Sequence, residues 1–224
     1  MIDPQAILER RREALAQARL YFVCEGRPHG GDPAGLLEAA LSEGVDIVQL
    51  REKAPRCAEE LLALAEPFRR AADRHGALFM LNDTPELVQA AEADGVHVGQ
   101  DDAPVAEARV QAGPGALVGL STHSREQFDA AVGATGAARP DQISVGPVFE
   151  TPTKEGRPAT GLGLISHAAV SGGAAPWFAI GGIDESRVGD VVAAGARRAV
   201  VVRAIRDAPD PGAAARSLRE ALDG

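Results

Sequence analysis

The chain has 224 residues, of which 45% are hydrophobic, 25% charged and only 4% aromatic, and its formal net charge is −9 at pH 7. This composition predicts an α/β domain with a sizeable core built from Ala, Val, Leu and Ile. The negative charge argues against a nucleic-acid partner, since no basic run interleaved with aromatics offers a track for phosphates.

The first expected element is a helix over residues 4–18. Pro4 stands at a favourable position for a helix start. The residues available for a buried face are Ile7, Leu8, Ala14 and Leu15. We expect residues 1–18 to form a helical extension that plugs or flanks the main fold.

Short apolar, β-branched runs then recur along the chain, and segments with helical spacing lie between them. The eight expected strands are residues 20–23, 45–50, 77–81, 95–98, 116–120, 142–145, 177–180 and 199–202. Eight units in 224 residues average about 28 residues each, the size of a short strand–helix module with tight loops. The pattern predicts an α/β fold of the (β/α)8 TIM-barrel type, with residues 1–224 as a single domain. An open doubly wound sheet is the structural alternative, which periodicity alone does not exclude.

Functional residues of such a barrel lie just after each strand, because the eight strand–helix loops converge on one face. Seven expected strands end in polar or glycine-rich segments. These segments are residues 49–53, 82–83, 100–102, 121–124, 146–154, 181–182 and 203. Any one of them also fits an ordinary turn. Together they indicate a site for a phosphorylated small molecule.

The segment after the second strand carries two cations. Arg51 and Lys53 alternate along extended chain, so both can point into one mouth beside Gln49. This arrangement predicts a clamp for a phosphorylated anion. The alternative is a surface ion pair that involves Glu52.

Two carboxylates follow neighbouring strands. Asp83 and Asp102 lie where carboxylates near an oligophosphate can hold Mg²⁺, with water and phosphate completing the octahedron. Both positions also have a local explanation, because Asp83 fits a turn with a helix N-cap and Asp102 fits a cap for a helix near Pro104. The sequence therefore leaves metal binding and capping open.

Later loops offer further anion contacts. The long segment with Thr151, Thr153 and Lys154 predicts a binding loop, although a solvated loop is the alternative. Gly182 and its preceding glycine let backbone N–H groups approach an anion near a helix start. His123 is a secondary candidate for proton transfer, since a lone strand-end histidine is more often structural.

Cysteine content and hydropathy indicate a cytoplasmic protein. Cys24 and Cys57 are too few for a disulfide scaffold and too far apart for a Cys-x-x-Cys site, so we expect free thiols. The N-terminal arginines precede a polar stretch and not the apolar core of a signal peptide. No run approaches the roughly 20 apolar residues that span a bilayer, so no membrane partner is expected.

With these residues laid out, the chain resembles the thiamine-phosphate synthase family from about Leu20 to Ile205. Six segments carry the resemblance in order: residues 48–53 (VQLREK), 81–83 (LND), 95–102 (GVHVGQDD), 121–124 (STHS), 146–154 (GPVFETPTK) and 179–183 (AIGGI). The resemblance implies a Mg²⁺-dependent transferase of thiamine biosynthesis. Its substrates would be 4-amino-2-methyl-5-hydroxymethylpyrimidine diphosphate and a thiazole phosphate, free or carboxylated, and its products thiamine phosphate and pyrophosphate.

The resemblance also assigns roles to residues of this chain. The residues implied to hold the pyrimidine diphosphate are Gln49, Arg51, Lys53, Asn82, Ser121 and Lys154, of which Arg51, Lys53, Ser121 and Lys154 are the candidate catalytic residues. Those implied for the thiazole phosphate are Thr151, Thr153, Gly182, Val202 and Arg203. Asp83 and Asp102 would bind Mg²⁺.

Arg203 departs from the family pattern, since many relatives carry a small hydroxyl residue there. We expect the backbone N–H to make the phosphate contact, so that the arginine is tolerated. One alternative function is that of a thiazole tautomerase, which shares the barrel and a histidine at the position of His123. Another is a non-catalytic barrel that binds phosphate ligands. A homodimer is compatible with the sequence.

Overall fold

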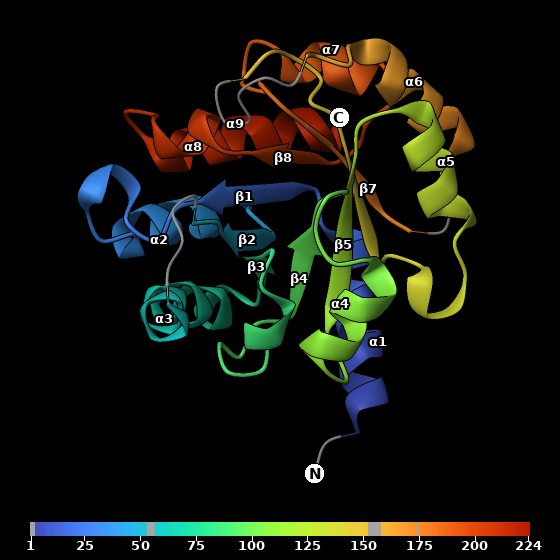
Figure 1. Cartoon of the computed structure of the whole chain (residues 1–224). Coiled ribbons are helices and arrows are strands. Elements are labelled where there is room, and N and C mark those ends of the chain that lie inside the picture. Colours follow the sequence, from blue (N-terminus) through green and yellow to red (C-terminus); the bar gives the residue numbers. More distant parts are fainter. Residues whose placement is uncertain (1–2, 53–56, 152–157, 174) are drawn as a thin grey trace.

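The computed structural model describes residues 3–52, 57–151, 158–173 and 175–224. Its parallel strands form a closed barrel in the order of the sequence, and β8 pairs again with β1 (Figure 1). The strands are β1 (Leu20–Cys24), β2 (Ile47–Leu50), β3 (Leu78–Asn82), β4 (Gly95–Val98), β5 (Leu117–Thr122), β6 (Gln142–Val145), β7 (Trp177–Ile180) and β8 (Ala199–Val201). The predicted barrel is confirmed, and the open sheet is excluded.

Every expected strand is present, and the bounds shift by only a few residues. The second strand starts at Ile47 and not at Val45, because the N–H of Val45 still bonds the carbonyl of Ala40 in the preceding helix. The carboxylate of Asp46 then binds the backbone at the start of β1.

Helices form the outer layer (Figure 1). They are α1 (Pro4–Gln17), α2 (Ala34–Ser42), α3 (Ala58–His75), α4 (Val105–Ala112), α5 (Arg125–Gly133), α6 (Leu162–Ser171), α7 (Val188–Ala193), α8 (Arg203–Arg206) and α9 (Pro211–Asp223). The prediction that strand and helix alternate throughout is wrong at one point. Residues 83–94 hold only a 3₁₀ turn, η2 (Pro85–Leu87), since this short connection is interrupted by positive φ angles at Asp83 and Glu92. None of the helices described is long and apolar enough to cross a membrane.

Two apolar layers hold the barrel together. Side chains that point outward from the strands, such as Phe22, Phe79 and Val96, pack against the helices. Alternate side chains point inward and form a second cluster with Leu15 of α1 and Ala18 just after it. Helix α1 therefore closes one end of the barrel. Of its expected buried face, Leu15 is buried and Ile7 and Leu8 are partly buried, but Ala14 is exposed because it lies on the outer side of the helix.

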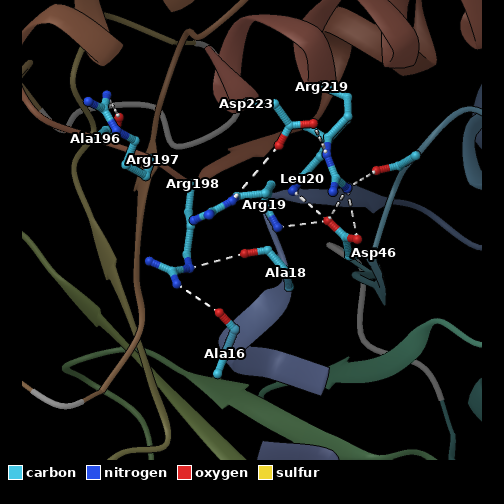
Figure 2. A network of polar contacts seen from close by, with 11 residues as sticks. Ala16, Ala18, Arg19, Leu20, Asp46, Ala196, Arg197, Arg198, Arg219 and Asp223 are labelled. Carbon is cyan, nitrogen blue, oxygen red and sulfur yellow. Dashed lines mark hydrogen bonds and ion pairs between the residues drawn. The ribbon is translucent and has the colours of Figure 1, made fainter. Parts of the chain in front are cut away.

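Charged residues fasten the end of the barrel at which the strands begin. Asp46 accepts hydrogen bonds from the backbone N–H groups of Arg19 and Leu20 at 2.7 and 3.0 Å, and it binds Arg219 of α9 (Figure 2). Arg198 donates to the carbonyls of Ala16 and Ala18 at the end of α1. The charged groups at this end of the barrel bind one another and the backbone, so we look for the ligand site at the opposite end.

The Asp46 arrangement recurs twice around the barrel. Asp94 and Asp141 precede β4 and β6, and each accepts a backbone N–H from the strand before it, from Phe79 at 2.8 Å and from Val118 at 2.9 Å. Arginines bind both carboxylates, including Arg11 and Arg12 of α1. The predicted N-terminal helix is thus attached to two strands by ion pairs as well as by apolar packing.

Candidate active site

A cavity of about 340 Å³ opens at the carboxyl ends of the strands, where the strand–helix loops converge. Eight of the predicted site residues line it: Gln49, Arg51, Asn82, Ser121, Thr151, Gly182, Val202 and Arg203. His123 lines it as well. Residues from six different strands or the loops that follow them therefore meet in one place, as the order of polar segments in the sequence predicts.

The five remaining predicted site residues are not among the described residues that line the cavity. Lys53, Thr153 and Lys154 lie outside the described residues. Asp83 and Asp102 follow neighbouring strands, but neither lines the cavity. Their role as metal ligands stays a prediction.

The two carboxylates make local bonds, but neither caps a helix as the alternative interpretation expects, since neither η2 nor α4 has a side-chain cap. Asp83 has a φ of 60° and accepts a bond from the side-chain amide of Asn82. Asp102 accepts the N–H of Gly99 at 2.7 Å. Among the described residues, no three His, Cys, Asp or Glu side chains converge as a metal site. Two carboxylates nevertheless suit Mg²⁺, which keeps several water ligands and takes further oxygens from substrate phosphates.

The predicted glycine pair brings two loops into close contact. Gly181 and Gly182 have φ values of 106° and 64°, which disfavour other residues. A Cβ on Gly181 would lie 2.5 Å from the Cα of Pro147, and one on Gly182 would lie 2.9 Å from the Cβ of Phe149. Glycine is therefore required here both by conformation and by space, and the backbone forms part of the cavity wall.

Three arginines supply positive charge to the cavity. Arg51 and Arg203 form no ion pair with any described carboxylate, although the chain is strongly acidic. Arg187, which the sequence interpretation missed, stacks on the ring of Phe149 at 5.0 Å and donates to the carbonyl of Gly182 at 2.9 Å. Arginines without carboxylate partners in a concave site indicate an anionic ligand.

A buried polar chain forms the floor of the cavity. His97 Nε2 lies 2.9 Å from Ser121 Oγ, and His97 Nδ1 lies 3.0 Å from Gln142 Oε1. The amide of Gln142 donates to Ser144 Oγ at 2.9 Å. The sequence interpretation assigned no role to His97, Gln142 or Ser144. The sequence does contain a pattern that could have identified them, because these polar residues alternate with Val or Ile inside otherwise apolar strands.

A second buried pair lies across the barrel. The side-chain amide of Gln49 donates to Tyr21 Oη at 2.6 Å, and both residues are almost fully buried. Burial raises the pKa of Tyr21 far above its usual range, so this phenol stays neutral. The pair fixes the amide of Gln49 and leaves it a donor and an acceptor at the cavity wall.

His123 is anchored to the backbone. Its Nδ1 donates to the carbonyl of Gly146 at 2.6 Å, which joins the loop after β5 to the loop after β6. This bond fits the structural interpretation of a strand-end histidine and orients the ring at the cavity wall.

Comparisons with known proteins agree with this geometry. The family model for thiamine monophosphate synthase matches residues 20–205. The thiamine-phosphate synthase of Acidothermus cellulolyticus is 50% identical over 91% of this chain and 94% of its own length. That of Mycobacterium sp. strain KMS is also 50% identical, over 93% and 94%.

A solved structure shows the same architecture. The thiamine phosphate pyrophosphorylase of Pyrococcus furiosus superposes with a TM-score of 0.81 at 26% identity, covering 95% of this chain and 98% of that chain. Family match, sequence identity and fold thus agree over almost the whole barrel. The chain belongs to the thiamine-phosphate synthase family and is a transferase.

Proposed function

We propose that this chain joins 4-amino-2-methyl-5-hydroxymethylpyrimidine diphosphate to 4-methyl-5-(2-phosphoethyl)thiazole, or to its carboxylated form, and releases pyrophosphate. The observation that carries the proposal is the set of arginines at the cavity, Arg51, Arg187 and Arg203, which lack carboxylate partners among the described residues. The protein as a whole is acidic, so a site for two phosphorylated substrates requires local positive charge of this kind.

The pyrimidine diphosphate is assigned to the side of the cavity formed by β2, β3 and β5. Gln49, held by Tyr21, offers its amide to the aminopyrimidine, while Asn82 and Ser121 add further polar contacts. Arg51 lies at the end of β2 and would bind the diphosphate, assisted by Lys53 and Lys154. These cations neutralise the charge that builds on pyrophosphate as its bond to the methylene carbon breaks.

The thiazole phosphate is assigned to the side formed by β7 and β8. Gly182 and the backbone of Val202 and Arg203 would hold its phosphate, and Thr151 with Thr153 would contact the ring. The thiazole nitrogen then forms the new bond to the methylene carbon, whose positive charge the aminopyrimidine ring delocalises. No protein nucleophile is needed, and placing both substrates in line supplies much of the rate enhancement.

Mg²⁺ fits the two carboxylates at the ends of β3 and β4. Asp83 and Asp102 would hold it, and when bound it would neutralise the diphosphate and stabilise the leaving group. Two carboxylates alone supply too few oxygens for the octahedral coordination of Mg²⁺. A diphosphate ligand and water would supply the rest, which supports this assignment.

The proposed working form is a single barrel domain in the cytoplasm. Both cysteines are free thiols, which suits a reducing compartment. A homodimer is a further prediction. Light scattering of the purified protein in solution measures its molar mass and so distinguishes a dimer from a monomer.

Pyrophosphate release from purified protein tests the proposed reaction. We expect release only when both substrates and Mg²⁺ are present. Asp102→Ala should lower the rate by at least about 10-fold, because losing even an outer-shell partner of a metal ligand has an effect of that size. The matched control Asp101→Ala removes the neighbouring exposed carboxylate and should retain the wild-type rate.

Two results would contradict the proposal. If wild type binds thiazole phosphate but forms no pyrophosphate, a tautomerase or a binding protein takes the place of the synthase. If release persists unchanged in chelator, or in Asp102→Ala, the metal assignment fails while the reaction stands.

A further inference from the structure

His97 lies at the centre of the polar chain beneath the cavity. It contacts Ser121 through Nε2 and Gln142 through Nδ1, and Gln142 contacts Ser144 in turn. The four side chains are all buried, with exposed fractions of 8%, 6%, 1% and 2% in the order His97, Ser121, Gln142 and Ser144. Buried polar groups that are each satisfied hold one another in a single arrangement.

The strand register explains how these residues meet. His97 on β4 and Gln142 on β6 are both paired with Gly119 of the intervening strand β5. A Cβ at Gly119 would lie 2.5 Å from His97 Nδ1 and 2.4 Å from Gln142 Oε1. Glycine therefore leaves the space in which two side chains from non-adjacent strands form their bond.

The hydrogen-bond directions follow from Gln142. Its amide nitrogen donates to Ser144 Oγ, so its oxygen faces His97. His97 then carries a proton on Nδ1, and in the neutral ring Nε2 is an acceptor. The hydroxyl of Ser121 donates to this nitrogen, which fixes its rotamer at the cavity wall.

We propose that His97 is a positioning residue that acts through Ser121, held in place across Gly119 by Gln142 and Ser144. The chain of bonds directs the Ser121 proton to His97 and leaves the hydroxyl oxygen as an acceptor for the amino group of the pyrimidine diphosphate before the substrate binds. This inference rests on the proposed function, in which Ser121 contacts that substrate. Ser121 is otherwise a small residue that can adopt several rotamers, so its orientation must come from its neighbours.

A double-mutant cycle between His97 and Ser121 tests this dependence. We expect His97→Leu to lower kcat for pyrophosphate release by roughly 10-fold, the effect of one misplaced hydrogen bond to substrate. In a Ser121→Ala background the same substitution should cost less than about 2-fold, because the group it positions is absent. His97→Gln retains a side-chain oxygen that can accept from Ser121, and it should restore part of the loss.

Gly119→Ala tests the same chain without changing any of its polar groups. The added methyl group displaces Gln142 from His97, so kcat should fall by a factor similar to that of His97→Leu. Thr122→Val is the matched control, since Thr122 lies on the same strand and faces the other way, and its hydroxyl donates to the backbone carbonyl of Ser144 and not to a side chain of the polar chain. It should retain wild-type kcat. Circular dichroism and thermal unfolding identify any variant that fails to fold.

Affinity separates this inference from the proposed function. Calorimetric titration with the pyrimidine diphosphate and Mg²⁺, without thiazole phosphate, measures a dissociation constant for each variant. The double-mutant cycle can then be calculated from these constants even if wild type shows no turnover. Coupled losses in kcat or affinity support the proposal. Losses that multiply independently in the double variant, or a folded His97→Leu protein with unchanged kcat and affinity, overturn it.

Discussion

Arg219 Nη1 donates to both carboxylate oxygens of Asp46, at 2.9 and 2.8 Å, although 173 residues separate them in the chain. The bond joins the C-terminal helix α9 to the residue before β2. Asp46 also accepts two backbone N–H groups at the start of β1, so one carboxylate connects three segments.

Asp46→Ala should destabilise the fold without altering the cavity. It leaves the N–H groups of Arg19 and Leu20 without their acceptor, and we expect the free energy of unfolding to fall by about 2 kcal/mol. Urea unfolding measures the change. Asp223→Ala, which removes the other carboxylate bound to Arg219 at a half-exposed site, should cost less than about 0.5 kcal/mol. Equal effects of the two substitutions would contradict this interpretation.

Two glycine substitutions should have opposite effects. A Cβ at Gly95 would lie 2.3 Å from the carbonyl oxygen of Leu117, so Gly95→Ala should lower the free energy of unfolding by about 1–3 kcal/mol. Gly35 lies in α2 with open space around it, and Gly35→Ala should raise stability by about 0.5 kcal/mol. Thermal and urea unfolding compare both variants with wild type. A neutral Gly95→Ala would show that β4 and β5 adjust more easily than their contact indicates.

The two cysteines should differ in reactivity. Cys24 is buried at the end of β1, and burial raises the pKa of its thiol well above the usual range, so little thiolate forms at pH 8. Cys57 is exposed at the start of α3. A soluble aromatic disulfide reagent should modify one thiol per native chain and two after unfolding. Cys57→Ser should react only when unfolded, and rapid labelling of that variant in the native state would disprove the prediction.

Stability should depend on pH through Asp207. The hydrogen bond from Arg206, at 2.6 Å, holds the pKa of this carboxyl below its usual value. The stabilisation of the folded state by the ionised Asp207 is therefore fully present above the unfolded pKa of about 3.9, and it is lost as the pH falls through the lower folded pKa. Wild type should be more stable than Asp207→Asn at pH 6, and this difference should vanish in strong acid. Unfolding curves at several pH values measure it.

The partner arginine provides the control for this prediction. In an Arg206→Gln background the largest cause of the lowered pKa is absent, so adding Asp207→Asn should introduce less pH dependence, and the remainder comes from His29, whose Nε2 lies 3.1 Å from Asp207 Oδ1. A difference that persists unchanged in this background would assign the effect to another group.

Much of the barrel was predictable because its signals are local. Each strand is a short apolar run, and successive side chains point alternately to the barrel interior and to the helix layer. The bounds predicted for the eight strands therefore differ from the observed bounds by only a few residues. The cavity residues Gln49, Arg51, Asn82 and Ser121 were found for the same reason, since residues at strand ends must face the mouth of a closed barrel.

Other features depend on register and distant contacts, which one sequence does not specify. No local pattern indicates that His97 and Gln142 meet across Gly119, or that Arg187 stacks on Phe149. The short connection with η2 was missed because twelve residues between strands fit either a helix or a turn.

The sequence by itself determined the order of strands, their inward and outward faces and the position of polar residues at their ends, because each follows from a period of two residues within a few positions. Only the tertiary structure decided which of those residues touch. Closing the barrel sets the stagger between neighbouring strands, and that stagger places His97, Gly119 and Gln142 side by side.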